Sequence, residues 1–110
     1  MAPSLKRLTA PVAADALEGE VVNQDIFEAA GFLPKRFADL MIIDPPYNIS
    51  KDFNGHLFKE KEKGEYCSWF ESVLDMVIPA LRPAGTVYVC SDWKTSMLVG
   101  PILEKRLCVR

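Results

Sequence analysis

The chain has 110 residues, a formal charge of −2 and an ordinary balance of apolar and charged residues, which is enough for at most one small domain with its own core. The charge argues against a self-sufficient nucleic-acid binder, because phosphate contacts require a basic surface that must here be local or lie elsewhere. Cys67, Cys90 and Cys108 are odd in number and widely spaced. This favours reduced cysteines of a cytoplasmic protein, and it indicates neither a disulfide framework nor a metal site. No apolar run approaches the roughly 20 residues that span a bilayer.

The first part of the chain predicts an N-terminal arm and the start of an α/β domain. Residues 1–19 form the arm, with two prolines, scattered charges and a helical turn or two over 13–18. The domain is expected to occupy residues 20–110. It opens with a short strand over 21–25 and a crossover over 26–37, which contains a short helix and is long enough to join parallel strands.

The second part of the chain predicts alternating strands and helices around one long loop. Residues 40–44 are expected to form a parallel strand buried on both faces, because the run has no polar alternation. Residues 48–64 form a polar loop, and apolar residues at helical spacing predict a helix over 66–81. The remaining elements are a turn at 83–85, a strand over 86–90, a helix over 93–107 that is either continuous or broken at a Gly-Pro pair, and an unfinished strand at 108–110.

Four side chains in this part have simple structural interpretations. Trp69, Phe70 and Trp93 are expected to pack in the core or at its rim. Asp92 follows a predicted strand and precedes a predicted helix, so we expect it to cap that helix.

The chain is organised around Asp44-Pro45-Pro46-Tyr47, which follows the apolar run of residues 40–43. A buried strand that ends at an acid places that acid at a carboxyl strand end, where open α/β sheets bind ligands. The prolines fix φ, and Pro46 also holds the residue before it in an extended conformation. Tyr47 then offers a flat ring at the rim of the sheet.

This motif, with Asn48 behind it, resembles the catalytic motif of the S-adenosylmethionine-dependent DNA amino-methyltransferases that act on adenine N6 or cytosine N4. The order of the flanking features agrees with the permuted members of that family: a strand ending in Asp25, an aromatic helix with Trp69 and Phe70, and then residues 81–89. The resemblance covers about residues 21–108. It implies a partial Rossmann-like methyltransferase fold with about three parallel strands, flanking helices and an incomplete sheet.

The resemblance also implies roles for particular residues. Asp44 and the Pro45 carbonyl would accept hydrogen bonds from the target amine, with Pro46 completing the catalytic motif, and Tyr47 would stack on a base flipped out of duplex DNA. Asp25 and Asp44 would contact the cofactor, S-adenosylmethionine. A structural role, capping of the helix that follows, is equally expected for Asp25, and the two roles are compatible. Asn48 and Lys51 are expected to border the base pocket.

An aspartate at the first motif position is typical of the adenine enzymes, so N6 of adenine is the expected target. The sequence contains no Gly-x-Gly segment, and half of a doubly wound sheet is predicted. We therefore expect a fragment of a larger enzyme, lacking the glycine-rich cofactor half and the target-recognition region, with little activity of its own. The alternatives are methylation of cytosine N4, methylation of an RNA base amine, and an inactive relic or interaction module, which would form a homodimer through its exposed sheet edge.

Overall fold

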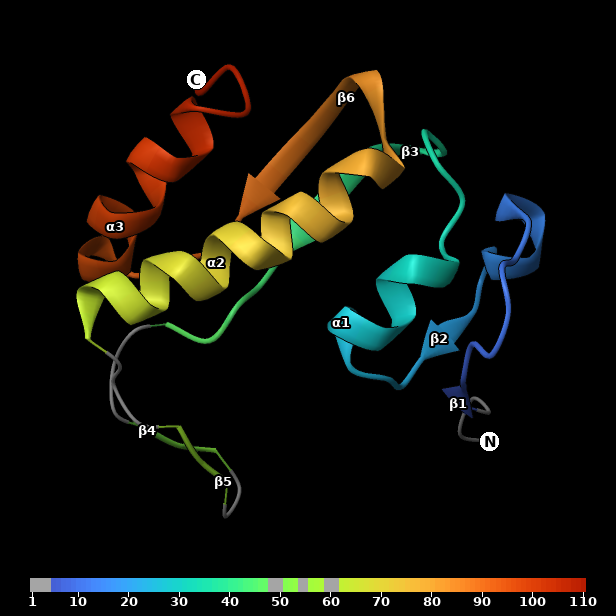
Figure 1. Ribbon diagram of the computed structural model, residues 1–110, viewed down its shortest axis with the longest axis horizontal. Coiled ribbons are helices and arrows are strands. Elements are labelled where there is room, and N and C mark those ends of the chain that lie inside the picture. Colours follow the sequence, from blue (N-terminus) through green and yellow to red (C-terminus); the bar gives the residue numbers. More distant parts are fainter. Residues whose placement is uncertain (1–4, 48–50, 54–55, 59–61) are drawn as a thin grey trace. The chain divides into compact units, whose positions relative to one another are not determined.

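The computed structural model describes residues 5–47, 51–53, 56–58 and 62–110. The strands are β1 (Leu5–Lys6), β2 (Val21–Val22), β3 (Ala38–Ile43), β4 (Lys51–Phe53), β5 (His56–Phe58) and β6 (Leu81–Val89). The helices are α1 (Ile26–Ala29), α2 (Lys63–Val77) and α3 (Trp93–Glu104), with 3₁₀ turns η1 (Ala14–Leu17), η2 (Ala30–Phe32) and η3 (Ile78–Ala80) (Figure 1). None of the described helices combines the length and apolar character needed to cross a membrane.

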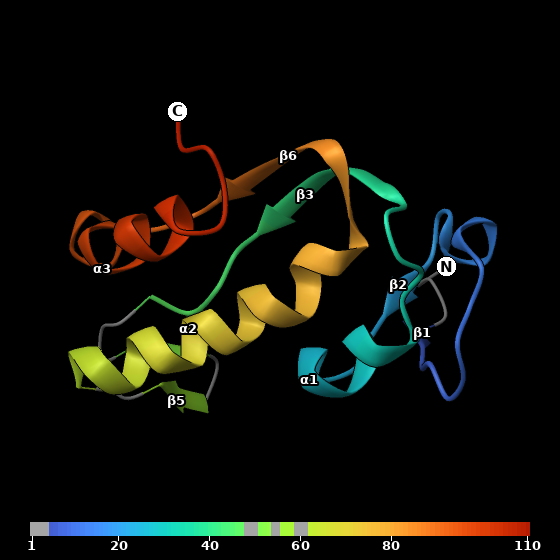
Figure 2. The same ribbon diagram turned by 45° about the horizontal axis from the view of Figure 1, so that its top comes forward.

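The described strands form three two-stranded sheets, in which β1 neighbours β2, β3 neighbours β6 and β4 neighbours β5. The β1–β2 pair is parallel, and the arrows of β3 and β6 point the same way in Figure 2. The fold is therefore an α/β fold with an incomplete sheet and flanking helices, which confirms the predicted partial Rossmann-like class. One pairing differs from the expectation: β2 pairs with β1, so the crossover after β2 does not join two neighbouring strands among those described.

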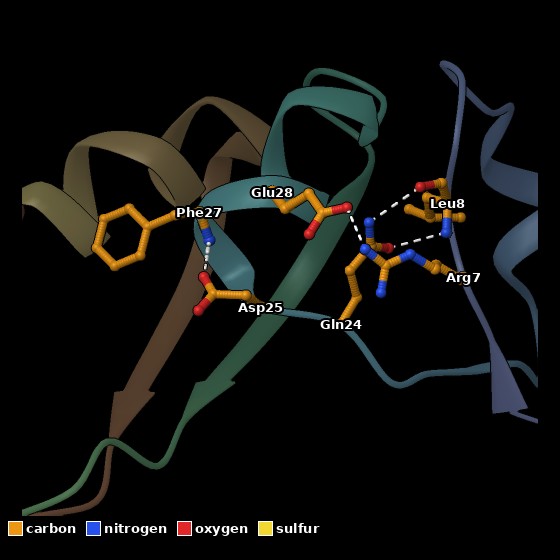
Figure 3. A network of polar contacts seen from close by, with 6 residues as sticks. All are labelled: Arg7, Leu8, Gln24, Asp25, Phe27 and Glu28. Atoms are coloured by element: carbon orange, nitrogen blue, oxygen red, sulfur yellow. Dashed lines mark hydrogen bonds and ion pairs between the residues drawn. The ribbon is translucent and has the colours of Figure 1, made fainter.

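The chain divides into two compact units, and the first contains Met1–Met41 and Val73–Thr86. In this unit the start of the chain is held by side chains near α1 (Figure 3). The Leu8 N–H donates to Gln24 Oε1 at 2.8 Å, and Gln24 Nε2 donates to the Leu8 carbonyl at 2.9 Å. Arg7 forms an ion pair with Glu28 at 2.6 Å. These contacts anchor part of the predicted arm to the rest of its unit, while the boundary predicted at residue 19 stays a prediction.

The core of the first unit combines the anchored segment with the C-terminal end of α2. Leu8 is only 2% exposed and Leu74 is fully buried. The other buried apolar residues of this unit are Ala29, Val73, Val77, Ala80 and Leu81. Because the α2 positions recur at helical spacing, they form one apolar stripe, as predicted.

The second unit contains Ile42–Ser72 and Val87–Arg110. Tyr66 and Phe70, one turn apart on α2, are both 0% exposed. From α3, Thr95, Val99 and Ile102 are buried as well. The helix predicted over 66–81 is confirmed as α2, which begins at Lys63 and is continued by η3 to Ala80.

The prediction of an unstructured loop over 48–64 is wrong for part of its length. Residues Lys51–Phe53 and His56–Phe58 pair as an antiparallel hairpin, with Phe53 opposite His56. The two residues between these strands in the sequence are Asn54 and Gly55, a dipeptide favoured in two-residue hairpin loops. The many charged residues over 51–63 are typical of a loop, whereas the Asn-Gly dipeptide favours a hairpin.

The prediction that residues 40–44 are buried on both faces is also wrong. Leu40 is 54% exposed and Ile42 is 65% exposed, while Met41 and Ile43 are half-buried. Burial on both faces requires helices on both sides of a sheet. Among the described residues, the side of β3 that carries Leu40 and Ile42 remains open.

Two smaller expectations after α2 need correction, the turn at 83–85 and the strand at 108–110, and the question of a break in the helix over 93–107 is answered. The turn predicted at 83–85 lies inside β6, which bends sharply at its start (Figure 1), and a Cβ at Gly85 would lie 2.6 Å from the Leu81 Cδ1 atom. The helix α3 runs through Pro101 without a break, because a proline removes one helical hydrogen bond without always ending the helix. Residues 108–110 form no strand, since a strand needs a paired neighbour to satisfy its backbone.

Candidate active site

The Asp44–Tyr47 segment leaves the sheet at the carboxyl end of β3, as predicted. The Cys90 N–H donates to the Ile43 carbonyl at 2.9 Å, so the residues directly after β3 and β6 lie next to each other. Carboxyl ends of neighbouring strands form the edge at which open α/β sheets bind ligands. Asp44 therefore lies at the carboxyl end of a strand, as predicted, while its catalytic role stays a prediction.

The four motif residues differ in burial. Asp44 is exposed, Pro45 is buried, Pro46 is exposed and Tyr47 is half-buried. The segment thus combines an accessible carboxylate with a ring that is partly covered and partly open. An acceptor for an amine and a surface for stacking a base are the two features that capture of an amino-bearing base needs.

Tyr66 on α2 contacts this segment directly, and sequence reasoning did not place it in the site. Its hydroxyl donates to the Pro46 carbonyl at 2.7 Å. Its ring lies nearly parallel to that of Phe70, with centroids 6.4 Å apart, and tilted against Trp69 at 5.5 Å. A tyrosine within an apolar helical stripe is the signal that could have revealed it, since a buried phenol needs a hydrogen-bond partner.

The surroundings of Tyr66 keep its hydroxyl protonated. Burial disfavours the phenolate and is the largest cause that raises the pKa of Tyr66 to about 12, followed by electrostatic interactions with Asp92 and with Cys67. A phenol with a pKa this far above neutrality remains a hydrogen-bond donor throughout the physiological pH range.

Asp92 caps α3, as predicted. Its Oδ1 accepts a hydrogen bond from the Thr95 N–H at 2.9 Å. Hydrogen bonding by Thr95 is the main cause that lowers the pKa of the Asp92 carboxyl. The next residue departs from expectation: Trp93, predicted to pack in the core or at its rim, is 71% exposed, and Lys94 Nζ lies 5.7 Å from its ring centroid. As the first residue of α3, Trp93 presents its side chain to solvent.

The structure shows less of the other three predicted site residues, Asp25, Asn48 and Lys51. Asp25 caps α1, with its Oδ1 accepting from the Phe27 N–H at 2.8 Å (Figure 3); it lies in the first unit, whereas Asp44 lies in the second. Its predicted contact with a cofactor stays a prediction. Asn48 lies outside the described residues, and Lys51 is described only as the first residue of β4.

The fold and this strand-end motif define a partial Rossmann-like α/β protein with a candidate site at the carboxyl ends of β3 and β6. A sequence profile described as DNA methylase matches residues 38–106, which include the motif and both of these strands. The match extends over more than half of the chain. The chain therefore belongs to the N6/N4 DNA methylase family.

Curated relatives agree with this assignment. The chain is 24% identical to the type II methyltransferase M.BamHI of Bacillus amyloliquefaciens over 84% of its own length and 22% of the relative. It is 28% identical to the type II methyltransferase M.HpaI of Haemophilus parainfluenzae over 83% of its length and 29% of the relative. It is 26% identical to the DNA adenine methyltransferase YhdJ of Escherichia coli K12 over 66% of its length and 24% of the relative. The chain thus spans less than a third of these proteins.

Proposed function

We propose that the protein to which this chain belongs transfers a methyl group from S-adenosylmethionine to the exocyclic N6 of adenine in DNA. The observation that carries the proposal is the exposed Asp44 at the carboxyl end of β3, in the same four-residue segment as the half-buried Tyr47. Membership in the DNA methylase family supports it. The type II naming of two relatives supports a place in a restriction-modification system, and we propose that the protein acts in the cytoplasm.

The chemistry of the amine explains the need for Asp44. The lone pair of an adenine amine is delocalised into the ring, so the nitrogen is a poor nucleophile. The Asp44 carboxylate and the Pro45 carbonyl would accept its two hydrogens, draw the nitrogen toward tetrahedral geometry and aim its lone pair. The carboxylate would also stabilise the positive charge that develops on the nitrogen before a proton leaves.

The exposed carboxylate of Asp44 also suits a cofactor that carries positive charge. When bound, S-adenosylmethionine supplies an electrophilic methyl group on a cationic sulfur. Asp44 would hold the cofactor from the motif, and Asp25 is proposed to contact it from the start of α1. No metal is required, because carboxylate and carbonyl acceptors provide the alignment that this transfer needs.

Tyr47 would hold the target base. A base that leaves the duplex loses its stacking partners, and an aromatic side chain replaces them at about 1 to 3 kcal/mol per base. The half-buried state of Tyr47 suits this role, because the covered part of the ring is supported while the open part remains free for stacking. Asn48 and Lys51 are proposed to border the same pocket.

The preference for adenine over cytosine N4 is supported by the aspartate at the first motif position and by the printed name of one relative, a DNA adenine methyltransferase. Methylation of an RNA base amine is the alternative with the same motif. A different observation favours an interaction module: β3 exposes Leu40 and Ile42, and β6 exposes Tyr88 at 62%. Apolar strand faces of this kind favour self-association, and sedimentation of the chain would detect a homodimer.

The proposal is tested by incubating a protein that carries this segment with S-adenosylmethionine and unmethylated genomic DNA, followed by mass spectrometry of the nucleosides. We expect N6-methyldeoxyadenosine, loss of the product with Asp44→Asn, and retention with Asp39→Asn, which changes an exposed aspartate on β3, the strand that precedes Asp44. Formation of N4-methyldeoxycytidine, or methylation of RNA alone, would replace the proposed substrate. For the 110 residues alone we expect little turnover.

A further inference from the structure

Tyr66 holds the catalytic segment from outside the motif. It reaches the segment from α2, twenty positions along the chain, through the 2.7 Å hydrogen bond from its hydroxyl to the Pro46 carbonyl. The Tyr66 side chain is 0% exposed, so water does not compete for the donor. A buried contact of this kind has a larger structural effect than one of equal length in solvent.

The ring of Tyr66 has little freedom to move. Phe70 stacks on it at 6.4 Å with an angle of 6° between the ring planes, and Trp69 lies against it at 5.5 Å with an angle of 50°. Phe70 is itself fully buried. The packing of Phe70 and Trp69 therefore holds the Tyr66 hydroxyl in place, and any large displacement of this donor would disturb the packed aromatic rings.

The hydrogen bond from Tyr66 restricts the backbone of the catalytic segment because its acceptor is the carbonyl of Pro46. The pyrrolidine ring of Pro46 already fixes its φ, so ψ is the remaining soft backbone torsion of that residue. The orientation of the Pro46 carbonyl depends on ψ of Pro46. A donor that fixes this carbonyl in one orientation therefore also restricts ψ. Because the next peptide unit is planar, fixing ψ of Pro46 sets the direction in which the Tyr47 backbone leaves.

We infer that Tyr66 is a positioning residue for the catalytic segment: its hydroxyl fixes ψ of Pro46 and thereby orients Tyr47 toward the target base. The orienting role follows from the geometry alone, and the functional consequence rests on the proposed function of Tyr47. The elevated pKa of Tyr66 agrees with this role, since the phenol stays a donor at neutral pH. Tyr66 does not touch the base, so its effect is on capture of the base more than on the methyl-transfer step.

The test compares the chain with Tyr66→Phe, which removes the donor and keeps the ring. Tyr88→Phe is the matched control, because it removes the same atom from a ring that is 62% exposed. With ¹³C-labelled proline carbonyls, Tyr66→Phe should shift the Pro46 carbonyl resonance upfield and lower the heteronuclear NOE of the Tyr47 amide. Tyr88→Phe should change neither signal. An unchanged Pro46 carbonyl in Tyr66→Phe would overturn the inference.

A second measurement needs no substitution and covers the case in which Tyr66→Phe does not fold. In the wild-type chain, the Tyr66 hydroxyl proton should exchange slowly with water and correlate with the labelled Pro46 carbonyl. A rapidly exchanging hydroxyl without that correlation would contradict the contact itself.

Binding of a base separates this inference from the proposed function. Deoxyadenosine is the probe, and its binding is followed through the ring resonances of Tyr47. Loss of one hydrogen bond predicts a rise in the dissociation constant of about three- to tenfold for Tyr66→Phe and none for Tyr88→Phe. If a protein that carries this segment binds no deoxyadenosine while the Pro46 carbonyl responds to Tyr66→Phe, the positioning stands and the proposed function fails.

Discussion

Each of the two units contains one short polar contact that holds a chain segment in place. The two contacts have nearly the same length but differ in their exposure to solvent. In the second unit, Tyr66 donates to the Pro46 carbonyl at 2.7 Å from a side chain that is 0% exposed. In the first unit, Arg7 meets Glu28 at 2.6 Å, but their side chains are 61% and 49% exposed. Water and salt can reach both partners of the Arg7–Glu28 ion pair, whereas the Tyr66 donor is withdrawn from solvent. The comparison teaches that burial, more than contact length, decides which segment is firmly positioned.

The largest expected loss of stability comes from removing Phe70, the ring that packs against Tyr66. Phe70→Ala deletes a fully buried ring stacked on Tyr66 and should lower the free energy of unfolding by about 3–5 kcal/mol. Urea denaturation measures it. Phe27→Ala is the control, because Phe27 is 42% exposed and its loss should have a much smaller effect. Equal losses of unfolding free energy in Phe70→Ala and Phe27→Ala would contradict the claim that burial decides how strongly a contact stabilises its unit.

Alkaline pH should weaken the second unit through Tyr66. The pKa of Tyr66 is raised to about 12, chiefly by burial and then by electrostatic interactions with Asp92 and Cys67, whereas tyrosine in an unfolded chain titrates near 10. The folded state therefore binds the proton more tightly. Its contribution is fully present below a pH of about 10 and is lost as the pH rises through about 12.

The difference in unfolding free energy between the wild type and Tyr66→Phe isolates this effect from other titrating groups. It should fall by an amount on the order of 1–4 kcal/mol across this pH range, since one pKa unit corresponds to about 1.36 kcal/mol. Phenolate absorbance gives the titration directly. Parallel stability curves for the two proteins would contradict the burial of this hydroxyl.

A smaller effect is expected from Gln24, which holds the start of the chain. Gln24→Ala removes both hydrogen bonds to the Leu8 backbone and should destabilise the protein by about 1–2 kcal/mol. Hydrogen exchange at the Leu8 amide should accelerate. Asn23→Ala changes the neighbouring exposed amide and serves as the control; equal acceleration in both variants would show that the Gln24 contacts do not hold the segment.

The smallest effect is expected from the exposed ion pair. A double-mutant cycle with Arg7→Ala and Glu28→Ala should give a coupling energy of about 0.2–1 kcal/mol, and added salt should reduce it further. A coupling that exceeds the effect of Gln24→Ala and resists salt would reverse the ranking of exposed and buried contacts.

Local patterns predicted the elements that position the site. Apolar spacing indicated α2, and the acid and prolines after an apolar run placed Asp44 at a strand end. The cap formed by Asp92 was predicted as well, because an aspartate before a helix satisfies its first N–H groups. Each of these features depends on residues close together in the sequence, where the physical chemistry of a single segment decides the outcome.

The features that the sequence did not predict depend on contacts between distant segments. The Tyr66 hydroxyl could be expected to need an acceptor, but only the fold shows that the acceptor is the Pro46 carbonyl. Likewise, the apolar run of β3 suggested burial on both faces, whereas Leu40 and Ile42 are exposed. A strand's own residues do not determine what covers each of its faces.

The central claim is that Asp44 belongs to a site for S-adenosylmethionine, and calorimetric titration of a protein that carries this segment with this cofactor tests it most directly. The variants Asp44→Asn and Asp25→Asn remove charge, and asparagine at position 25 retains the ability to cap α1. Asp39→Asn changes an exposed aspartate that pairs with Arg82 and serves as the control. The account predicts saturable binding that the first two variants weaken and the control does not. Absence of saturable binding, or equal affinity for Asp44→Asn and the wild type, would contradict it.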